Sequence, residues 1–423
     1  MNHATSEELI VSLDRSDASL AVALLSIATG QLEHVTVSTK PEELDSWWRD
    51  LQSAHPDARL LVAFEQPAPN LLAFFAARPP AAIYALNPSA TWAYRQSLVV
   101  SHARTDQSDA HHQALYILHH RDQLTPWTPP PRTVEQLGRL CEARRKFVDT
   151  RTGLTNRLQG VLKRYYPQAL EIMHEDIWRP LNLAFLRRWP TPQALQTARS
   201  TTLRRFFHQQ GSRSETCWGR RSQVLAVLVP LSAEEPLSER LEVTVLADQI
   251  EALNTGILRY DRAINELFAH CADAALIEAL PGAGPAMAPR LYVAFARYAG
   301  NCASAADFAA AVGVAPVTDQ SGKMRKVYRR LRCDKHTRQS FVEWARESIK
   351  HSAWARAFFD QRKAAGHYAQ ATFRALAYKW TRILWRCWRE RTPYDEAKYL
   401  ATLRAKGSHL LKDLPAAPAL QPA

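Results

Sequence analysis

The chain has 423 residues, of which 46% are hydrophobic, and its 54 Lys and Arg against 41 Asp and Glu give a formal net charge of +13. That length predicts two or three domains with sizeable cores, and the basic balance favours a polyanionic partner. The six cysteines include no C-x-x-C pair, which excludes an ordinary zinc ribbon and a disulfide framework; without a recognisable signal peptide or transmembrane stretch, we expect a soluble protein of the reducing cytoplasm with no membrane partner.

Residues 1–131 are predicted to form a mixed α/β domain. Short apolar or alternating runs predict strands, and proline and acidic residues mark helix starts. The expected strands lie at 9–13, 20–27, 32–38, 59–65 and 82–86, and the expected helices at 41–52, at 70–77 and around Asp106 and Asp109. The predicted order is therefore β-β-β-α-β-α-β-α.

Four carboxylates stand out in this order. Asp14 and Glu65 end two apolar strands, where open α/β sheets place their ligand crevices. Asp106 and Asp109 are three residues apart, so on a helix they share one face and can approach the same metal ion. A surface carboxylate is the ordinary interpretation of any one of them. Four acids at these positions together favour a metal site.

A helical region is expected over 132–275. The proline-rich segment Thr125-Pro-Trp-Thr-Pro-Pro-Pro131 before it predicts a stiff linker and a domain boundary. Apolar residues from Val243 to Leu267 alternate spacings of three and four, as a coiled coil or a long helical hairpin requires. We favour dimerisation through this seam, with a monomeric bundle as the alternative. Residues 178–218 are predicted to be irregular.

Residues 276–395 are predicted to form a mostly α C-terminal domain, followed by a tail over 396–423. It opens with Pro281-Gly-Ala-Gly-Pro, which resembles a helix-hairpin-helix turn whose glycine amides can approach a DNA phosphate. A plain helix–helix turn is the alternative. Residues 318–326 are expected to form a polar loop that holds Ser321, and helices over 335–390 complete the domain.

Basic residues concentrate near the C-terminus: the segment from Ser321 to Arg391 contains 19 basic and 5 acidic residues. A solvated basic face is the simpler interpretation, but neutralised phosphates release counterions and so favour a nucleic acid. We assign most aromatic residues of this stretch to core packing. The candidate nucleic-acid-binding residues are Gly282, Gly284, Lys323, Arg325, Lys326, Arg329 and Arg330.

These motifs resemble the DEDD transposases of bacterial insertion sequences, family one-ten and its sister group one-one-one-one, over nearly the whole chain. The most specific blocks are Arg104-Thr-Asp-Gln-Ser-Asp-Ala and Ala315-Pro-Val-Thr-Asp-Gln-Ser-Gly-Lys. The resemblance implies a RuvC-like N-terminal domain of the ribonuclease H fold and a serine nucleophile in the C-terminal domain. Two features depart from the family: Gln-Pro-Ala-Pro follows Glu65, and no glycine precedes Asp14, which leaves Asp17 as a competing ligand.

The chemistry that the resemblance implies divides between the two ends of the chain. Asp14, Glu65, Asp106 and Asp109 would hold one or two Mg²⁺ ions at the scissile phosphate. Ser321 would attack phosphorus and form a phosphoserine link, with Lys323, Arg325 and Lys326 gripping the DNA backbone. The implied partners are double-stranded DNA of the element ends and target and a noncoding guide RNA, in the bacterial nucleoid. The homodimer or larger oligomer that we expect rests on the apolar seam.

Three other functions stay open from the residues alone. A metal-dependent structure-specific nuclease, such as a junction resolvase, needs the acids but not Ser321. A noncatalytic nucleic-acid-binding protein needs only the basic surface, and a strand-transferring DDE-type enzyme uses a DNA 3′-hydroxyl and forms no protein adduct. We favour the serine recombinase because it alone uses both halves of the chain.

Overall fold

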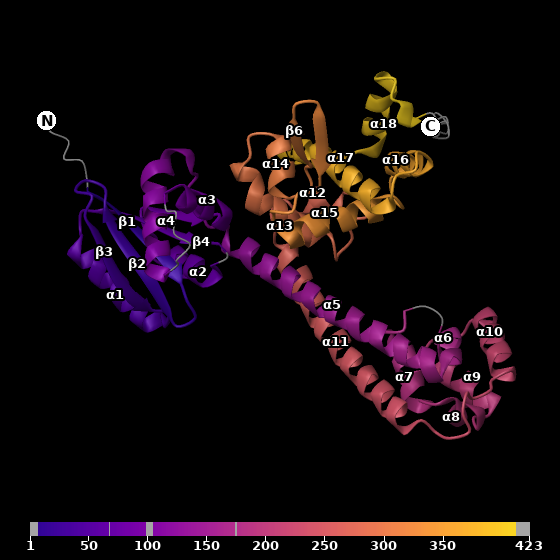
Figure 1. Cartoon of the computed structure of the whole chain (residues 1–423). Helices are drawn as coiled ribbons and strands as arrows, with labels where there is room; N and C mark the ends of the chain where they lie inside the picture. The colour runs from indigo at the N-terminus through magenta and orange to yellow at the C-terminus, as the bar shows by residue number, and fades with distance from the viewer. Residues whose placement is uncertain (1–6, 67, 99–104, 174–175, 412–423) are drawn as a thin grey trace. The chain divides into compact units, whose positions relative to one another are not determined.

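The computed structural model describes residues 7–66, 68–98, 105–173 and 176–411, and the chain divides into two compact units (Figure 1). The first unit, 1–130, contains a five-stranded sheet, and the second, 131–423, is mostly helical. Within the described ranges, no helix is both long and apolar enough to cross a membrane. Arg104 of the first specific motif block lies outside those ranges.

The sheet of the first unit mixes antiparallel and parallel pairing in the order β3-β2-β1-β4-β5. Its strands are β1 (Glu8–Arg15), β2 (Ser19–Ser26), β3 (Leu32–Ser38), β4 (Arg59–Glu65) and β5 (Ala82–Leu86). The first three strands form an antiparallel meander, and β1, β4 and β5 run parallel. All five predicted strands are confirmed.

Helices cover both faces of this sheet. They are α1 (Pro41–Ala54), α2 (Pro69–Ala77), α3 (Pro88–Leu98) and α4 (Asp106–His120). Alternate residues of β1 face opposite sides, so Val11 packs with Trp48 of α1 and Phe75 of α2, whereas Ile10 packs with Ala114 of α4. The predicted order lacked α3, a helix of low amphipathicity that packs on α4.

Two long helices, α5 (Arg132–Tyr165) and α11 (Leu237–Ala269), lie along each other in the second unit (Figure 1). The chain between them contains α6 (Pro167–Met173), α7 (Pro180–Arg188), α8 (Pro192–Gln196), α9 (Ser200–Gln209) and α10 (Glu215–Ala226). The prediction of an irregular 178–218 was therefore wrong: these helices are short, several begin at a proline, and together they bury one apolar core.

The predicted apolar seam packs within the chain. Val243, Leu246 and Ile250 join the core formed with α6 to α9, and Ile264 joins the core of the C-terminal helices. The seam therefore serves a helical hairpin of one chain, and its spacing alone does not require a second copy.

Most of the C-terminal region is a helical bundle with an aromatic core. Its helices are α12 (Ala274–Glu278), α13 (Ala288–Tyr298), α14 (Ala305–Ala311), α15 (Lys335–Ser348), α16 (Ala353–Ala364), α17 (Ala369–Glu390) and α18 (Glu396–Ala405). Trp344, Trp354 and Trp380 are fully buried, as expected for core aromatics. Part of the predicted tail is helical, as α18, and residues 412–423 lie outside the described residues.

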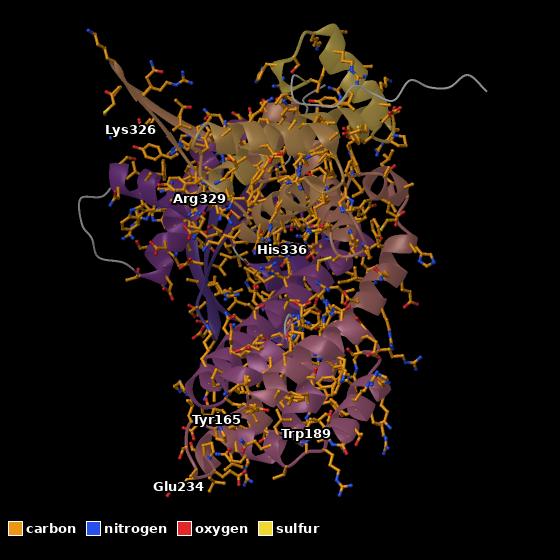
Figure 2. The ribbon with its side chains drawn as sticks, turned by 90° about the vertical axis from the view of Figure 1, so that its right-hand side faces the viewer. Tyr165, Trp189, Glu234, Lys326, Arg329 and His336 are labelled. Carbon is orange, nitrogen blue, oxygen red and sulfur yellow. The ribbon has the colours of Figure 1, made fainter. Side chains whose placement is uncertain are left out.

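A two-stranded hairpin replaces the polar loop that we predicted around Ser321. Strands β6 (Val317–Ser321) and β7 (Met324–Tyr328) pair antiparallel, and all ten residues are exposed. Gly322, at φ +56°, supplies the left-handed backbone of the two-residue turn. Figure 2 shows the hairpin extending beyond the helices of its unit, with Lys326 along it.

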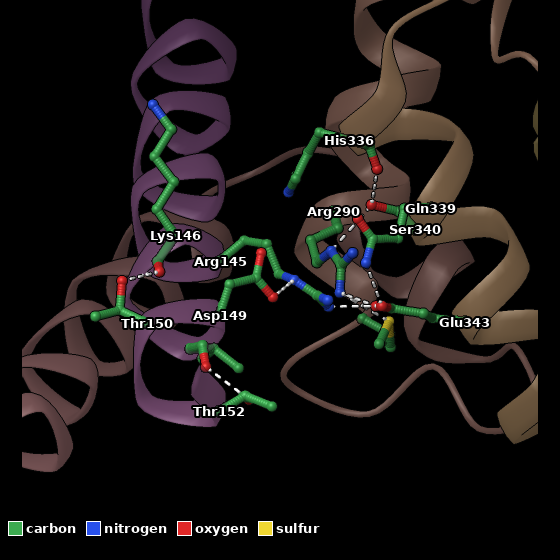
Figure 3. A network of polar contacts seen from close by, with 12 residues as sticks. Arg145, Lys146, Asp149, Thr150, Thr152, Arg290, His336, Gln339, Ser340 and Glu343 are labelled. Carbon is green, nitrogen blue, oxygen red and sulfur yellow. Dashed lines mark hydrogen bonds and ion pairs between the residues drawn. The ribbon is translucent and has the colours of Figure 1, made fainter. Parts of the chain in front are cut away.

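Ion pairs fix α5 against the C-terminal helices (Figure 3). Glu343 of α15 accepts Arg145 Nη1 of α5 at 2.6 Å and Arg290 Nη1 of α13 at 2.9 Å. Arg290 also donates to Ser340 Oγ at 2.9 Å. The long hairpin and the C-terminal bundle are thus joined by a half-buried polar network as well as by apolar contacts.

Candidate active site

Asp14 and Glu65 lie side by side at the carboxyl ends of β1 and β4, two neighbouring parallel strands inside the sheet. The parallel register pairs Leu13 with Phe64, so each acid is the next residue of its own strand. Neighbouring strands are about 4.8 Å apart. Because side chains alternate, both acids point to the face that Ile10, Leu61 and α4 cover.

Helix α4 brings the second pair of acids to this end of the strands. Thr105 caps the helix by accepting the Ser108 amide at 3.1 Å, and Asp106 and Asp109 follow within the first turn. Ala110 and Ala114 are fully buried against the sheet and hold the helix there. Carboxylates in a first turn also suit the positive end of the helix dipole.

The other three carboxylates act electrostatically on Asp14. Burial, together with the negative charges of Asp109, Asp106 and Glu65, raises the pKa of Asp14 to about 6. A hydrogen bond from Gln113 opposes this rise. The structure therefore brings the three other predicted acids close enough to Asp14 for their charges to act on it.

Three further residues of this site escaped the sequence analysis. Gln113 Nε2 donates to Asp14 Oδ1 at 3.2 Å, and Gln113 Oε1 accepts Ser12 Oγ at 3.3 Å. Thr91 Oγ1 donates to Glu65, and Arg95 Nη1 lies 2.9 Å from Asp109 Oδ1. Gln113 stands four residues after Asp109, a spacing that places both on one helix face. Nothing in the sequence pointed to Thr91 and Arg95, because the helix α3 that carries them was not predicted.

A cavity of about 210 Å³ opens beside these groups. Its lining includes Glu65 and Asp109, the α3 residues Thr91, Trp92 and Arg95, and the α4 residues His112 and Gln113. Glu65 and Asp109 are therefore accessible to a small ion or to an oxygen of a larger substrate.

The donors suit a divalent cation in type and in charge. Carboxylate oxygens are the ligands that Mg²⁺ prefers. Burial is the main cause of the raised pKa of Asp14, and the three neighbouring carboxylates contribute further to it. In the part of the chain that the structure describes, no three or more His, Cys, Asp or Glu side chains are spaced to hold one metal ion. The Arg95 guanidinium instead neutralises Asp109. Metal binding would therefore require the carboxylates to close in and Arg95 to give way.

Asp17 is a weaker competitor for a metal ion than Asp14. It is exposed, two residues beyond the end of β1, and it is absent from the charges that act on Asp14.

Ser321 lies in the second unit, at the end of β6 beside the hairpin turn. The register pairs Ser321 with Met324, Gln320 with Arg325, and Asp319 with Lys326. Because side chains alternate along a strand, Lys326 shares the face of Ser321, and Arg325 lies on the opposite face. Lys323 belongs to the turn.

The remaining predicted nucleic-acid-binding residues differ in their surroundings. Gly282 has φ +74°, and a Cβ atom there would meet His351 Cδ2 at 3.0 Å and the Glu347 carbonyl carbon at 3.2 Å, so this glycine serves packing. Gly284 faces open space. Arg330 donates to the Ala315 carbonyl at 3.4 Å, and Arg329 is exposed.

Two family models match this chain. Residues 11–167 match a model described as a transposase, of the IS110 DEDD type, and residues 274–360 match one described as "Transposase IS116/IS110/IS902 family". The chain belongs to the IS110 family of transposases. The first match contains all four carboxylates of this transposase, and the second contains Ser321.

Curated relatives of the transposase are similar over much of their length. The "Mini-circle putative transposase for IS117" of Streptomyces coelicolor is 24% identical over 330 residues, covering 76% of this chain and 79% of the relative. The "Insertion element IS116 uncharacterized 44.8 kDa protein" of Streptomyces clavuligerus is 27% identical over 299 residues, 70% of this chain and 73% of the relative. The transposase is accordingly an enzyme that acts on DNA.

Proposed function

We propose that this transposase cuts and rejoins DNA through a phosphoserine intermediate at Ser321, assisted by Mg²⁺ at Asp14, Glu65, Asp106 and Asp109. The observation that carries the proposal is the convergence of the four carboxylates at the carboxyl ends of β1 and β4, in a family member that also presents a serine on an exposed hairpin. The β-β-β-α-β-α-β order supports a RuvC-like, ribonuclease H fold for the first unit.

Two elements of the first unit would supply the metal ligands. Bound Mg²⁺, one ion or two, would polarise the scissile phosphate and neutralise charge that develops in the transition state. Asp14 and Glu65 are set by the paired strands, and Asp106 and Asp109 by the capped start of α4. Gln113 holds one oxygen of Asp14 and leaves the other available.

Ser321 would begin a transesterification in which each bond broken is matched by one formed. Its Oγ attacks phosphorus and loses its proton to solvent, the bond from phosphorus to a deoxyribose oxygen breaks, and that oxygen takes up a proton. A DNA hydroxyl then attacks the phosphoserine and releases the serine. Lys326, on the same hairpin face, would bind a phosphate oxygen during both steps.

We further propose a homodimer or larger oligomer. Leu237, Leu241 and Val245 lie four residues apart along α11 and are each more than half exposed, which forms an apolar stripe outside the chain's own core. Sedimentation of Leu241→Glu beside the native protein tests this: an unchanged mass would argue against the stripe as an interface.

A noncoding guide RNA and residence in the bacterial nucleoid complete the proposal. A protein that leaves sequence reading to base pairing needs mainly backbone contacts, which the basic C-terminal region would supply. Copurification of a discrete RNA from cells that carry the gene and its flanking DNA tests the RNA partner. Protein that binds element DNA and forms the adduct without RNA would argue against it.

Covalent trapping tests the serine mechanism. The protein, co-expressed with the DNA that flanks its gene, is incubated with labelled junction DNA and Mg²⁺, and a denaturant-resistant protein–DNA adduct is sought. We expect the adduct in the native protein and in Thr318→Ala, a hydroxyl of the same strand on the opposite face, but not in Ser321→Ala or Asp109→Asn.

A metal-dependent structure-specific nuclease is the second candidate. The acidic site lies wholly within the first unit and is built without Ser321, which favours this alternative. DNA cleavage that persists in Ser321→Ala without any adduct would establish it and refute the phosphoserine step.

A further inference from the structure

A groove runs between α17 and α18 in the C-terminal bundle, with a cavity volume of about 960 Å³. It lies outside both segments that the family models match, 11–167 and 274–360. Its lining carries five cationic side chains, Lys379, Arg382, Arg386, Lys398 and Lys406.

The three acidic side chains that line the groove accept hydrogen bonds from groups close to them. Glu390 accepts Arg386 Nε at 2.8 Å. Asp395 caps α18 by accepting the Lys398 amide at 3.0 Å. Glu396 accepts Ser352 Oγ and the Ala353 amide, each at 3.0 Å. None of them pairs with the other four cations, which form no ion pair within the described residues. The acids keep their charge, and the cations of the groove outnumber them by five to three.

Two of these cations, Lys379 and Arg382, lie close enough to repel each other. Burial lowers the pKa of Lys379, and the neighbouring charge of Arg382 lowers it further. The Lys379 ammonium lies over the rings of Trp354 and Phe358, at 5.4 and 5.2 Å from their centroids. Packing therefore holds one cation in place while Arg382, Lys398 and Lys406 remain exposed.

We propose that the α17–α18 groove binds the phosphodiester backbone of the DNA on which the transposase acts. Several cations along an open groove suit a row of phosphates, because each contact relieves their repulsion and releases counterions from the DNA. The inference deepens the proposed function and rests on the DNA substrate of the family, not on the serine step. Such contacts position DNA without reading its sequence.

Salt-dependent binding tests the groove in the full-length protein. The probe is a random-sequence DNA duplex, followed by fluorescence anisotropy over a KCl series, in a Ser321→Ala background so that adducts do not interfere. The groove variant combines Arg382→Gln, Lys398→Gln and Lys406→Gln. The matched control combines Arg346→Gln, Arg356→Gln and Lys363→Gln, three exposed cations of α15 and α16 that do not line the groove.

We expect the groove variant to bind at least tenfold more weakly, with a slope of log K against log salt reduced by about 2 to 3, since each lost phosphate contact is worth about 0.9. The control should change the slope by less than half as much. Equal effects in the two variants would overturn the groove assignment, as would a loss seen with an RNA duplex but not with DNA.

Thermal unfolding of both variants separates binding from folding, and the single variants Arg382→Gln and Lys406→Gln replace the combination if it is unstable. Because the readout is binding, a failed adduct experiment would leave the groove result intact. If the groove variant binds DNA more weakly while the native protein forms no adduct in the covalent-trapping experiment, only the serine mechanism is refuted.

Discussion

The Arg95 guanidinium lies 2.9 Å from the Asp109 carboxylate, and the two side chains are only 7% and 14% exposed. A buried carboxylate is costly without a partner, and here the partner comes from α3 of the same unit. Asp109 is one of the four acids proposed to bind metal, so Arg95 and a divalent cation compete for the same oxygens. Without a metal ion, the Arg95 guanidinium therefore serves as the counter-ion of Asp109.

Replacing Arg95 should strengthen metal binding. Arg95→Gln removes the competing charge, and we expect Mn²⁺ affinity to rise about tenfold, as loss of a modest ion pair implies. Isothermal titration of the Ser321→Ala protein measures it. Arg15→Gln, an exposed cation at the end of β1, serves as the control. Weaker binding in Arg95→Gln would mean that Arg95 positions Asp109 for the ion instead of excluding it.

The raised pKa of Asp14 should make metal-free stability fall as pH rises. Below its ordinary pKa of 3.8, Asp14 is protonated in both folded and unfolded chains; as pH rises through about 6, the folded carboxyl ionises beside three acids and this stabilisation is lost. Such a shift corresponds to about 3 kcal/mol, which partial exposure reduces to about 1 to 2.

Asp14→Asn should therefore unfold with a higher free energy than the native protein at pH 8, and with a similar one near pH 4, in chemical denaturation with EDTA present. Asp17→Asn, an exposed acid of the same segment, is the control and should change little. A native-to-variant difference that does not vary with pH would contradict the electrostatic origin.

The two faces of the hairpin should differ in importance. Lys326→Ala removes a cation from the face of Ser321, and we expect adduct formation to slow by about tenfold to a hundredfold, the value of one charge-assisted hydrogen bond. Arg325→Ala makes the same change of charge one residue away, on the opposite face, and should cost much less. Single-turnover rates measure both, and equal losses would argue against a face-specific role.

Loss of Glu343 should weaken the attachment of α5 to the C-terminal bundle. Burial raises the pKa of Glu343, but Arg290 and Arg145 outweigh it and leave the pKa below its ordinary value of 4.5. The charged pairs therefore stabilise the fold above that pH, and this contribution is lost as pH falls through the folded pKa. Glu343→Gln should lower the free energy of unfolding at pH 7 by about 1 to 3 kcal/mol, because it leaves the buried Arg290 without its charged partner.

Glu347→Gln provides the comparison for that variant. Glu347 is on the same helix as Glu343, but it pairs with the exposed Lys350 just beyond the end of that helix. Loss of this pair should therefore cost well under 1 kcal/mol by urea denaturation. If the two variants were equally destabilised, the buried network would not be the cause.

Local patterns sufficed for the strands and for two positions of the site. Alternation and short apolar runs marked β1 and β4, and Asp14 and Glu65 follow from where those runs stop. The α4 pair followed from helical spacing. The hairpin was missed although Gly322-Lys323 between alternating residues is a two-residue turn signal, because its polar strands lack a buried face.

The sequence by itself determined the five strands of the first unit, the helices α1, α2 and α4, the four acids and the family motifs, since these depend on residues close together in the chain. Only the tertiary structure decided that Gln113 holds Asp14, that Arg95 neutralises Asp109, and that the α11 seam packs within one chain. Those contacts join elements far apart in sequence. Which faces meet depends on the packing of the whole unit, and no local period encodes it.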